Sequence, residues 1–177
     1  TLSTGVYPSR HGIVGNSWSE FDLGEWRSVY SVEDLDRTIL GYPALPGRSP
    51  ANINRQGLSD WIVASDSSSR VVSVSSKDRA AVGLAAKAAG DVYWILQDEG
   101  QFATSDFYQS EYPGWVERFN QVTMPRIYAD SVWNSTVPSE ARSLTRPDTS
   151  VFELDGEETA FPHWGVERMG SSNPRAL

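Results

Sequence analysis

A β-branched run in the middle of the chain constrains the fold most strongly. Residues 70–75 read Arg-Val-Val-Ser-Val-Ser between turn-forming stretches, which predicts a buried strand. The Ala-rich stretch 80–89 ends at Gly90, and this composition predicts a helix that stops at a glycine. A second apolar run, 92–96, predicts another strand. The order strand, helix, strand indicates an α/β fold.

Other elements are predicted from shorter patterns. Residues 1–4, which precede Gly5, are typical of the last turn of a helix. Clusters of Pro, Gly and Asn predict loops over 7–12 and 42–54. Five further elements are expected: a hairpin over 18–30, a helix over 53–65, a strand over 101–104, a helix over 113–122 and a strand over 151–154. The rest of the chain after 125 is expected to be irregular.

Composition excludes several classes of function. The 177 residues are 39% hydrophobic and 21% charged, as in folded globular proteins. A formal net charge of −8 repels a phosphate backbone, so we expect no nucleic-acid partner. The absence of Cys excludes disulfides, thiolate metal sites and thiol nucleophiles. No apolar run is long enough to cross a bilayer, so no membrane partner is expected.

The strongest candidate site is Lys77-Asp78-Arg79, between a predicted strand and a predicted helix. Ligands of α/β sheets gather at the carboxyl ends of strands, and free N–H groups at a helix start attract anions. Two cations at this point are suited to a phosphoryl group, which Arg binds with paired hydrogen bonds. The alternative is a solvated loop in which Asp78 caps the helix.

Three other polar residues are also site candidates. Asn16 follows Gly15, so it is either a turn residue or an amide donor to an oxyanion. His11, in a tight loop, is expected to be a structural hydrogen-bonding residue. His163 is expected to pack against Trp164. The two histidines are not at metal-ligand spacing, so no metal ligand is assigned in this chain.

Three blocks of sequence resemble one known family. Residues 4–18, Thr-Gly-Val-Tyr-Pro-Ser-Arg-His-Gly-Ile-Val-Gly-Asn-Ser-Trp, resemble a block of the type I phosphodiesterase and nucleotide pyrophosphatase group of the alkaline phosphatase superfamily. Residues 73–81, Ser-Val-Ser-Ser-Lys-Asp-Arg-Ala-Ala, are similar to a segment of its phosphomonoesterase branch. The stretch from 92 to 120 also follows the family pattern, and the match thins after about Trp133.

The resemblance implies an α/β/α sandwich and a zinc-dependent phosphate monoester hydrolase, an alkaline phosphatase. Family members use a Thr or Ser nucleophile between two zinc ions. The nucleophile would precede Thr1, and the zinc ligands would also lie outside this chain. The resemblance assigns Asn16, Lys77 and Arg79 to the oxygens of the phosphoryl group. A Lys and an Arg together favour a dianionic monoester over a diester.

The resemblance also implies how the chain is organised. Residues 1–177 would be an internal fragment of one alkaline-phosphatase-like domain, with about 1–105 in the α/β core and about 106–177 in a cap or insertion. The fragment alone is expected to be inactive without the rest of its parent protein, which would act on a small phosphate ester in the periplasm or outside the cell. Two alternatives stay open: a phosphodiesterase or nucleotide pyrophosphatase of the same fold, and a non-catalytic carbohydrate-binding module that uses exposed aromatic residues.

Overall fold

The computed structural model describes residues 1–129, 132–149 and 160–164, so the strand expected at 151–154 lies outside the described residues. The chain divides into two compact units. The first contains Thr1–Leu96 and Phe102–Gly114, and the second contains Gln97–Gln101 and Trp115–Leu177. The cap predicted for the second part of the chain stays a prediction.

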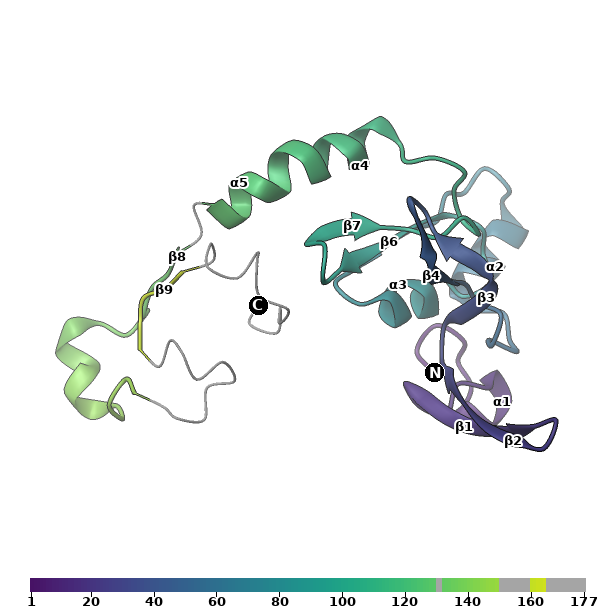
Figure 1. Ribbon diagram of the computed structural model, residues 1–177, viewed down its shortest axis with the longest axis horizontal. Coiled ribbons are helices and arrows are strands. Elements are labelled where there is room, and N and C mark those ends of the chain that lie inside the picture. Colours follow the sequence, from purple (N-terminus) through teal and green to yellow (C-terminus); the bar gives the residue numbers. More distant parts are fainter. Residues whose placement is uncertain (130–131, 150–159, 165–177) are drawn as a thin grey trace. The chain divides into compact units, whose positions relative to one another are not determined.

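The predicted strand–helix–strand unit is present in the first compact unit. Strand β5 (Val72–Ser75) pairs in parallel with β6 (Asp91–Leu96), and β7 (Gln101–Ala103) is the third strand of the sheet, in the order β5-β6-β7. Helix α3 (Asp78–Ala85) connects β5 to β6 and packs on both (Figure 1). The α/β class is therefore confirmed. The helix is shorter than predicted because Ala86 turns into positive φ, at 53°.

The core of this unit lies between α3 and the sheet. The α3 side chains that face the sheet are small, so the helix backbone lies close to β6. Trp94 of β6, only 3% exposed, supplies the bulk that these small side chains lack. The buried core cluster consists of Val32, Ile39, Ile53, Ala81, Val82, Ala85, Val92, Trp94 and Ala103.

Tyr93 of β6 makes the stability of this core sensitive to alkaline pH. Burial, followed by the nearby charges, raises the pKa of Tyr93 from 10.0 to about 12. Folding therefore favours the neutral phenol, a stabilisation that is complete below pH 10 and is lost as pH rises through about 12. We expect the free energy of unfolding of Tyr93→Phe to fall less than that of the wild type over this window. Urea denaturation of both proteins between pH 10 and pH 12 measures this difference. An equal fall in the free energy of unfolding of the variant and the wild type would contradict the prediction.

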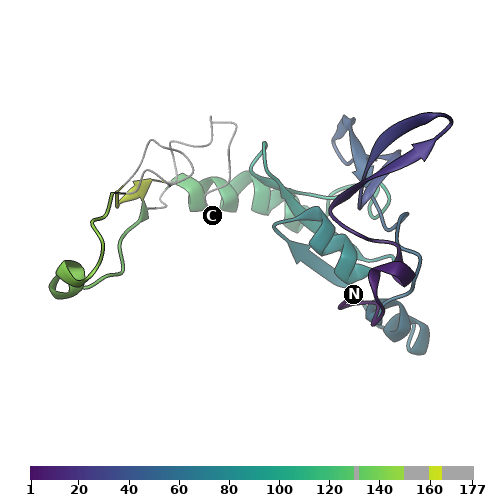
Figure 2. The same cartoon turned by 90° about the horizontal axis from the view of Figure 1, so that it is seen from below.

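The predicted hairpin over 18–30 is confirmed. Strands β1 (Ser17–Asp22) and β2 (Glu25–Tyr30) pair antiparallel and form a two-stranded ribbon, drawn in purple to dark blue in Figure 2. Leu23 and Gly24 make the turn at φ 49° and 92°. Two consecutive positive φ angles are those of the tight turn that suits the twist of a hairpin.

The loop expected over 42–54 is wrong for its first half. Strand β4 (Tyr42–Arg48) pairs antiparallel with β3 (Glu33–Ile39), which was not predicted. Prolines are tolerated here because each strand of a two-stranded sheet is an edge, so a missing N–H breaks no central ladder. Gly47 is required by close approach, because a Cβ at this position would collide with the Cβ and backbone of Arg37.

The ends of several other elements differ from prediction. Residues 1–4 form a turn closed by the bond from the Gly5 N–H to the Thr1 carbonyl at 2.9 Å, and the loop expected over 7–12 contains helix α1 (Pro8–His11). Helix α2 (Leu58–Ser65) begins at 58 rather than 53. It begins there because Asp60 accepts the N–H of Gly57 at 2.6 Å and so closes the first turn.

The second unit is more helical than predicted. Helix α4 (Gly114–Arg118) continues through a π-helical turn (Phe119–Thr123) into α5 (Met124–Ala129), and a 3₁₀ helix follows at Ser139–Leu144. The irregular structure expected after 125 is therefore wrong for these residues. Pro125 caused the error: proline usually ends a helix, but here it lies inside the continuous helical run, just after the π-helical turn.

A short antiparallel pair, β8 (Val132–Trp133) and β9 (His163–Trp164), also lies in the second unit. The His163 ring lies 4.7 Å from that of Phe161 and 5.5 Å from that of Trp133. The expected packing of His163 against Trp164 stays a prediction, because the side chain of Trp164 lies outside what the structure describes. No described helix of either unit combines the length and the hydrophobicity that a membrane crossing requires.

Candidate functional site

The Lys77-Asp78-Arg79 segment lies where β5 leads into α3. Lys77 is the N-cap residue, with extended φ and ψ of −119° and 133°, and Asp78 and Arg79 form the first turn. The Ser73 hydroxyl donates to the carbonyl of Ala81 at 2.7 Å, which fastens the strand to the helix. The site residues are thus carried by rigid elements at the carboxyl end of a parallel strand, as the sequence predicts.

The carboxylate of Asp78 is the centre of a polar network. Its Oδ1 accepts the Tyr30 hydroxyl at 2.6 Å and the Arg79 N–H at 2.7 Å. Its Oδ2 accepts Nε–H of Arg48 at 2.7 Å, an ion pair whose side chains are 14% and 22% exposed. The amide of Arg79 is therefore not free to bind an external anion. The helix start therefore differs from the prediction in this one N–H group, which the carboxylate of the preceding residue already occupies.

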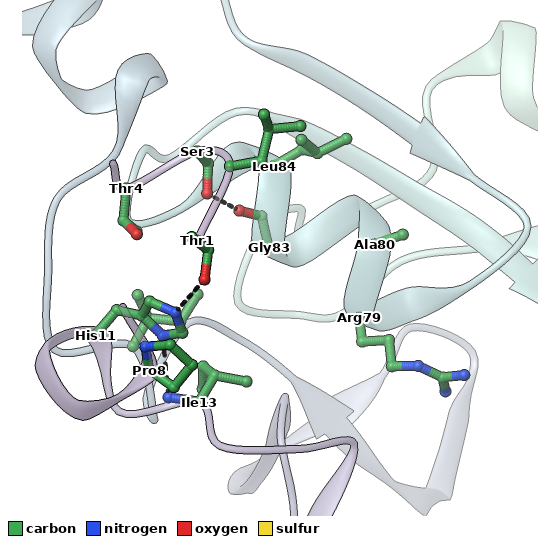
Figure 3. A pocket seen from close by; sticks show the side chains of 12 residues that line it. Thr1, Ser3, Thr4, Pro8, His11, Ile13, Arg79, Ala80, Gly83 and Leu84 are labelled. Carbon is green, nitrogen blue, oxygen red and sulfur yellow. Dashed lines mark hydrogen bonds between the residues drawn. The ribbon is translucent and has the colours of Figure 1, made fainter. Parts of the chain in front are cut away.

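The guanidinium of Arg79 is held by a tyrosine from another element. Nη1 of Arg79 donates to the Tyr30 hydroxyl oxygen at 3.0 Å, and the same hydroxyl donates its proton to Asp78. Burial, with the bond to Asp78 second, raises the pKa of Tyr30, so the phenol stays protonated. Figure 3 shows the Arg79 side chain extending away from Thr1 and His11.

Arg48 supports the network from β4. Its guanidinium carbon lies 5.1 Å from the centre of the Tyr30 ring, a cation–π contact. Its Nη1 donates to the carbonyls of Pro46 and Gly47 at 2.9 Å and 3.1 Å. The pairing of Asp78 with Arg48 leaves the positive charges of Lys77 and Arg79 uncompensated. In the part of the chain that the structure describes, the Lys77 side chain has no hydrogen bond or ion pair.

Asn16 directly precedes β1, the strand that pairs with the tyrosine-bearing β2. Its carbonyl accepts the N–H of Ser31 at 2.9 Å, and the next residue, Ser17, pairs with Tyr30. The Asn16 side chain is exposed. Two neighbouring residues therefore contact the two candidate site residues: Ser31 bonds Asn16 through its backbone N–H, and Tyr30 bonds Arg79 through its side-chain hydroxyl. Within the described residues, the side chains of Asn16, Lys77 and Arg79 make no direct hydrogen bond to one another.

A pocket of about 320 Å³ opens beside the start of α3. His11 lines it and is 4% exposed. Its Nδ1 accepts the N–H of Ile13 at 3.1 Å, so in the neutral ring Nε2 carries the proton and donates to the Thr1 hydroxyl, also at 3.1 Å (Figure 3). Burial lowers the pKa of His11 and keeps the ring neutral. The structural role predicted for His11 is confirmed, and this tautomer does not serve as a base for Thr1.

The described residues do not form a zinc site. Residues 1–129, 132–149 and 160–164 contain no group of three or more His, Asp or Glu placed to hold a metal ion. A zinc site needs at least three such ligands. The hydrogen-bond donors among the predicted site residues are the side chains of Asn16, Lys77 and Arg79.

Sequence reasoning missed Tyr30 and Arg48. Both are far from Asp78 in the chain, and only the tertiary fold brings their side chains, from β2 and β4, to its carboxylate. Arg48 also falls within a stretch that was expected to be loop. No spacing in the sequence indicates either contact.

Comparison with known proteins links this geometry to phosphate chemistry. The sequence model of a family described as type I phosphodiesterase / nucleotide pyrophosphatase matches residues 1–168. Alkaline phosphatase PhoV of Synechococcus elongatus is 34% identical over 168 residues, which is 92% of this chain and 30% of that protein. Alkaline phosphatase PafA of Elizabethkingia meningoseptica is also 34% identical, over 92% of this chain and 31% of its own length. This chain therefore spans about 30% of the length of these relatives.

Solved structures give the same result. The crystal structure of wild-type PafA superposes with a TM-score of 0.78 at 32% identity, covering 93% of this chain and 32% of that one. A second crystal structure, with a TM-score of 0.76, is of a PafA variant with four substitutions. In that variant a threonine is replaced by serine, and an asparagine, a lysine and an arginine are each replaced by alanine.

Proposed function

Since this chain belongs to the type I phosphodiesterase / nucleotide pyrophosphatase family, we propose that it is part of a phosphate monoester hydrolase, an alkaline phosphatase, in which Asn16, Lys77 and Arg79 bind the phosphoryl oxygens. The observation that carries the proposal is a pair of cations, Lys77 and Arg79, presented at the carboxyl end of β5 with their charges uncompensated. Their nearby carboxylate, Asp78, is paired with Arg48 instead.

The PafA variant supports the choice of these three residues. Its replaced lysine and arginine are two positions apart, as are Lys77 and Arg79, and its asparagine precedes the lysine by nearly the distance that separates Asn16 from Lys77. The order asparagine, lysine, arginine is also the same. We infer that the residues chosen for replacement in that alkaline phosphatase correspond to those that the resemblance assigns here.

The charge of the site favours a monoester. A phosphate monoester is a dianion with three terminal oxygens, whereas a diester carries one charge and a second organic group. Two cations and one amide can satisfy three oxygens and balance two charges. The same donors bind a diester less well, because one oxygen is blocked and one charge is missing.

The nucleophile and the zinc ligands of the proposed reaction are expected to be residues other than those described here. A metal pair of this kind stabilises the attacking and the leaving oxygen. The residues of this chain would orient the phosphoryl group and neutralise its charge. Any assay of function therefore uses the full-length parent protein.

The test is hydrolysis of p-nitrophenyl phosphate and of bis-p-nitrophenyl phosphate by the full-length parent supplied with zinc. We expect kcat/KM for the monoester to exceed that for the diester by at least about tenfold, the effect of roughly one charged hydrogen bond. A preference for the diester would instead favour the phosphodiesterase or nucleotide pyrophosphatase alternative.

The carbohydrate-binding alternative has weaker support. Trp26, Trp61 and Trp115 are 72%, 48% and 57% exposed, which such a module needs. The first two lie on separate elements, the β1–β2 hairpin and α2, and do not form one described groove. Arg79 is held within a polar network rather than turned away into solvent. These features favour the phosphatase.

A further inference from the structure

The Tyr30 hydroxyl lies between the partly buried carboxylate of Asp78 and the arginine that we assign to phosphate binding. It donates to Asp78 at 2.6 Å and accepts from Nη1 of Arg79 at 3.0 Å. We propose that Tyr30 is a positioning residue, which fixes the Arg79 guanidinium in the orientation that binds the phosphoryl group. This inference rests on the proposed function, because it concerns the same site.

The direction of each hydrogen bond favours a fixed guanidinium. A hydroxyl has one proton, and Tyr30 donates it in the hydrogen bond to the Asp78 carboxylate. A lone pair of the hydroxyl oxygen is therefore available to accept a hydrogen bond from Arg79. Arginine has five N–H donors in a rigid plane. One donor bonded to Tyr30 sets the plane of the group and leaves the other donors available for phosphoryl oxygens. A long, flexible side chain that is already ordered loses less entropy when substrate binds.

The tyrosine is itself held on two sides. Arg48 lies over the face of its ring, and Nε of the same Arg48 bonds the carboxylate that receives the Tyr30 proton. Arg48 is fastened in turn to two carbonyls of β4. The ring and the hydroxyl proton of Tyr30, which lies on β2, therefore have partners from two other elements, β4 and α3.

The tyrosine also separates Asp78 from the charge of Arg79. In the described part of the chain the ion-pair partner of Asp78 is Arg48. The Arg79 guanidinium is linked to the Asp78 carboxylate through the neutral phenol of Tyr30. A direct ion pair between Asp78 and Arg79 would cancel charge that a dianionic substrate needs. The raised pKa of Tyr30 supports this arrangement, because the phenol remains neutral.

The experiment is Tyr30→Phe in the full-length parent, assayed with p-nitrophenyl phosphate. Loss of one hydrogen bond to a charged group is expected to lower kcat/KM about tenfold. The matched control is Tyr112→Phe, because Tyr112 is a similarly half-buried tyrosine whose hydroxyl donates to the carbonyl of Leu40 at 2.8 Å, away from the network. The control is expected to keep the wild-type rate.

A double-mutant cycle separates positioning from a general effect on stability. In an Arg79→Ala background, Tyr30→Phe is expected to change kcat/KM by less than about twofold, because the group it positions is gone. Tyr30→Phe is also expected to lower the rate with the diester less than the rate with the monoester. A tenfold fall that persists without Arg79 would overturn the inference, as would an unchanged rate in the single variant.

The outcomes distinguish this inference from the proposed function. If Arg79→Ala lowers monoester hydrolysis and Tyr30→Phe does not, the function stands and the positioning role fails. If the parent does not hydrolyse monoesters, or Arg79→Ala leaves the rate unchanged, the proposed function fails and the positioning role fails with it.

Discussion

Replacement of Arg79 by alanine in the full-length parent is expected to lower kcat/KM for p-nitrophenyl phosphate by about 10²–10³, the usual effect of removing one preorganised donor from a transition state. Lys77→Ala is expected to have an effect of similar size. The reason is that neither cation forms an ion pair with Asp78, whose carboxylate is paired with Arg48, so both charges are available to the phosphoryl group. Steady-state kinetics with the monoester measures both losses.

The chain supplies a matched control for the lysine. Lys87 is its other lysine, and it is exposed beyond the far end of α3. Lys87→Ala removes the same charge from the same region and is expected to leave kcat/KM unchanged. Lys77 has no described side-chain partner, so Lys77→Ala should leave the free energy of unfolding within about 0.5 kcal/mol of wild type. A rate loss shared by Lys77→Ala and Lys87→Ala would point to a general electrostatic effect and not to a phosphate contact.

The elements that sequence predicted correctly are those whose signal is local. The strand over 70–75 contains a β-branched run, and the helix after it is rich in alanine. The hairpin over 18–30 has turn-forming residues at its centre. The position of Lys77 and Arg79 at a strand end followed from that order. These are statements about neighbours in the chain, which a single sequence contains.

What sequence could not predict depends on pairing between distant segments. Prolines and a glycine made β4 resemble a loop, although an edge strand tolerates them. The loss of β4 from the prediction also hid Arg48, and with it the fact that Asp78 is paired and that Arg79 depends on Tyr30. The helix start was predicted to offer free N–H groups, but the carboxylate of its first residue, Asp78, already occupies one of them.

The same network makes Asp78 the residue whose loss is expected to affect both stability and rate. Asp78→Ala removes the bonds from Arg48 and Tyr30 and leaves the Arg48 guanidinium, whose side chain is only 22% exposed, without its ion partner. Bonds to charged groups and half-buried unpaired charges each cost on the order of 1.5–3 kcal/mol. Because the pair is not fully buried, we expect a loss of about 2 kcal/mol in the free energy of unfolding, measured by urea denaturation.

The control for stability is an ion pair of similar length in full solvent. Arg27 and Glu20 are 2.9 Å apart with side chains 51% and 43% exposed, so Arg27→Ala should cost no more than about 1 kcal/mol. For the rate, Asp78→Ala should lower kcat/KM at least as much as Tyr30→Phe, because the Tyr30 proton loses its acceptor and Arg79 loses its orientation. Addition of Arg48→Met should restore part of the stability by removing the unpaired charge, but not the rate. An Asp78→Ala variant as stable and as active as the wild type would show that the network contributes neither to stability nor to catalysis. The orientation of Arg79 would then have to be set by the substrate.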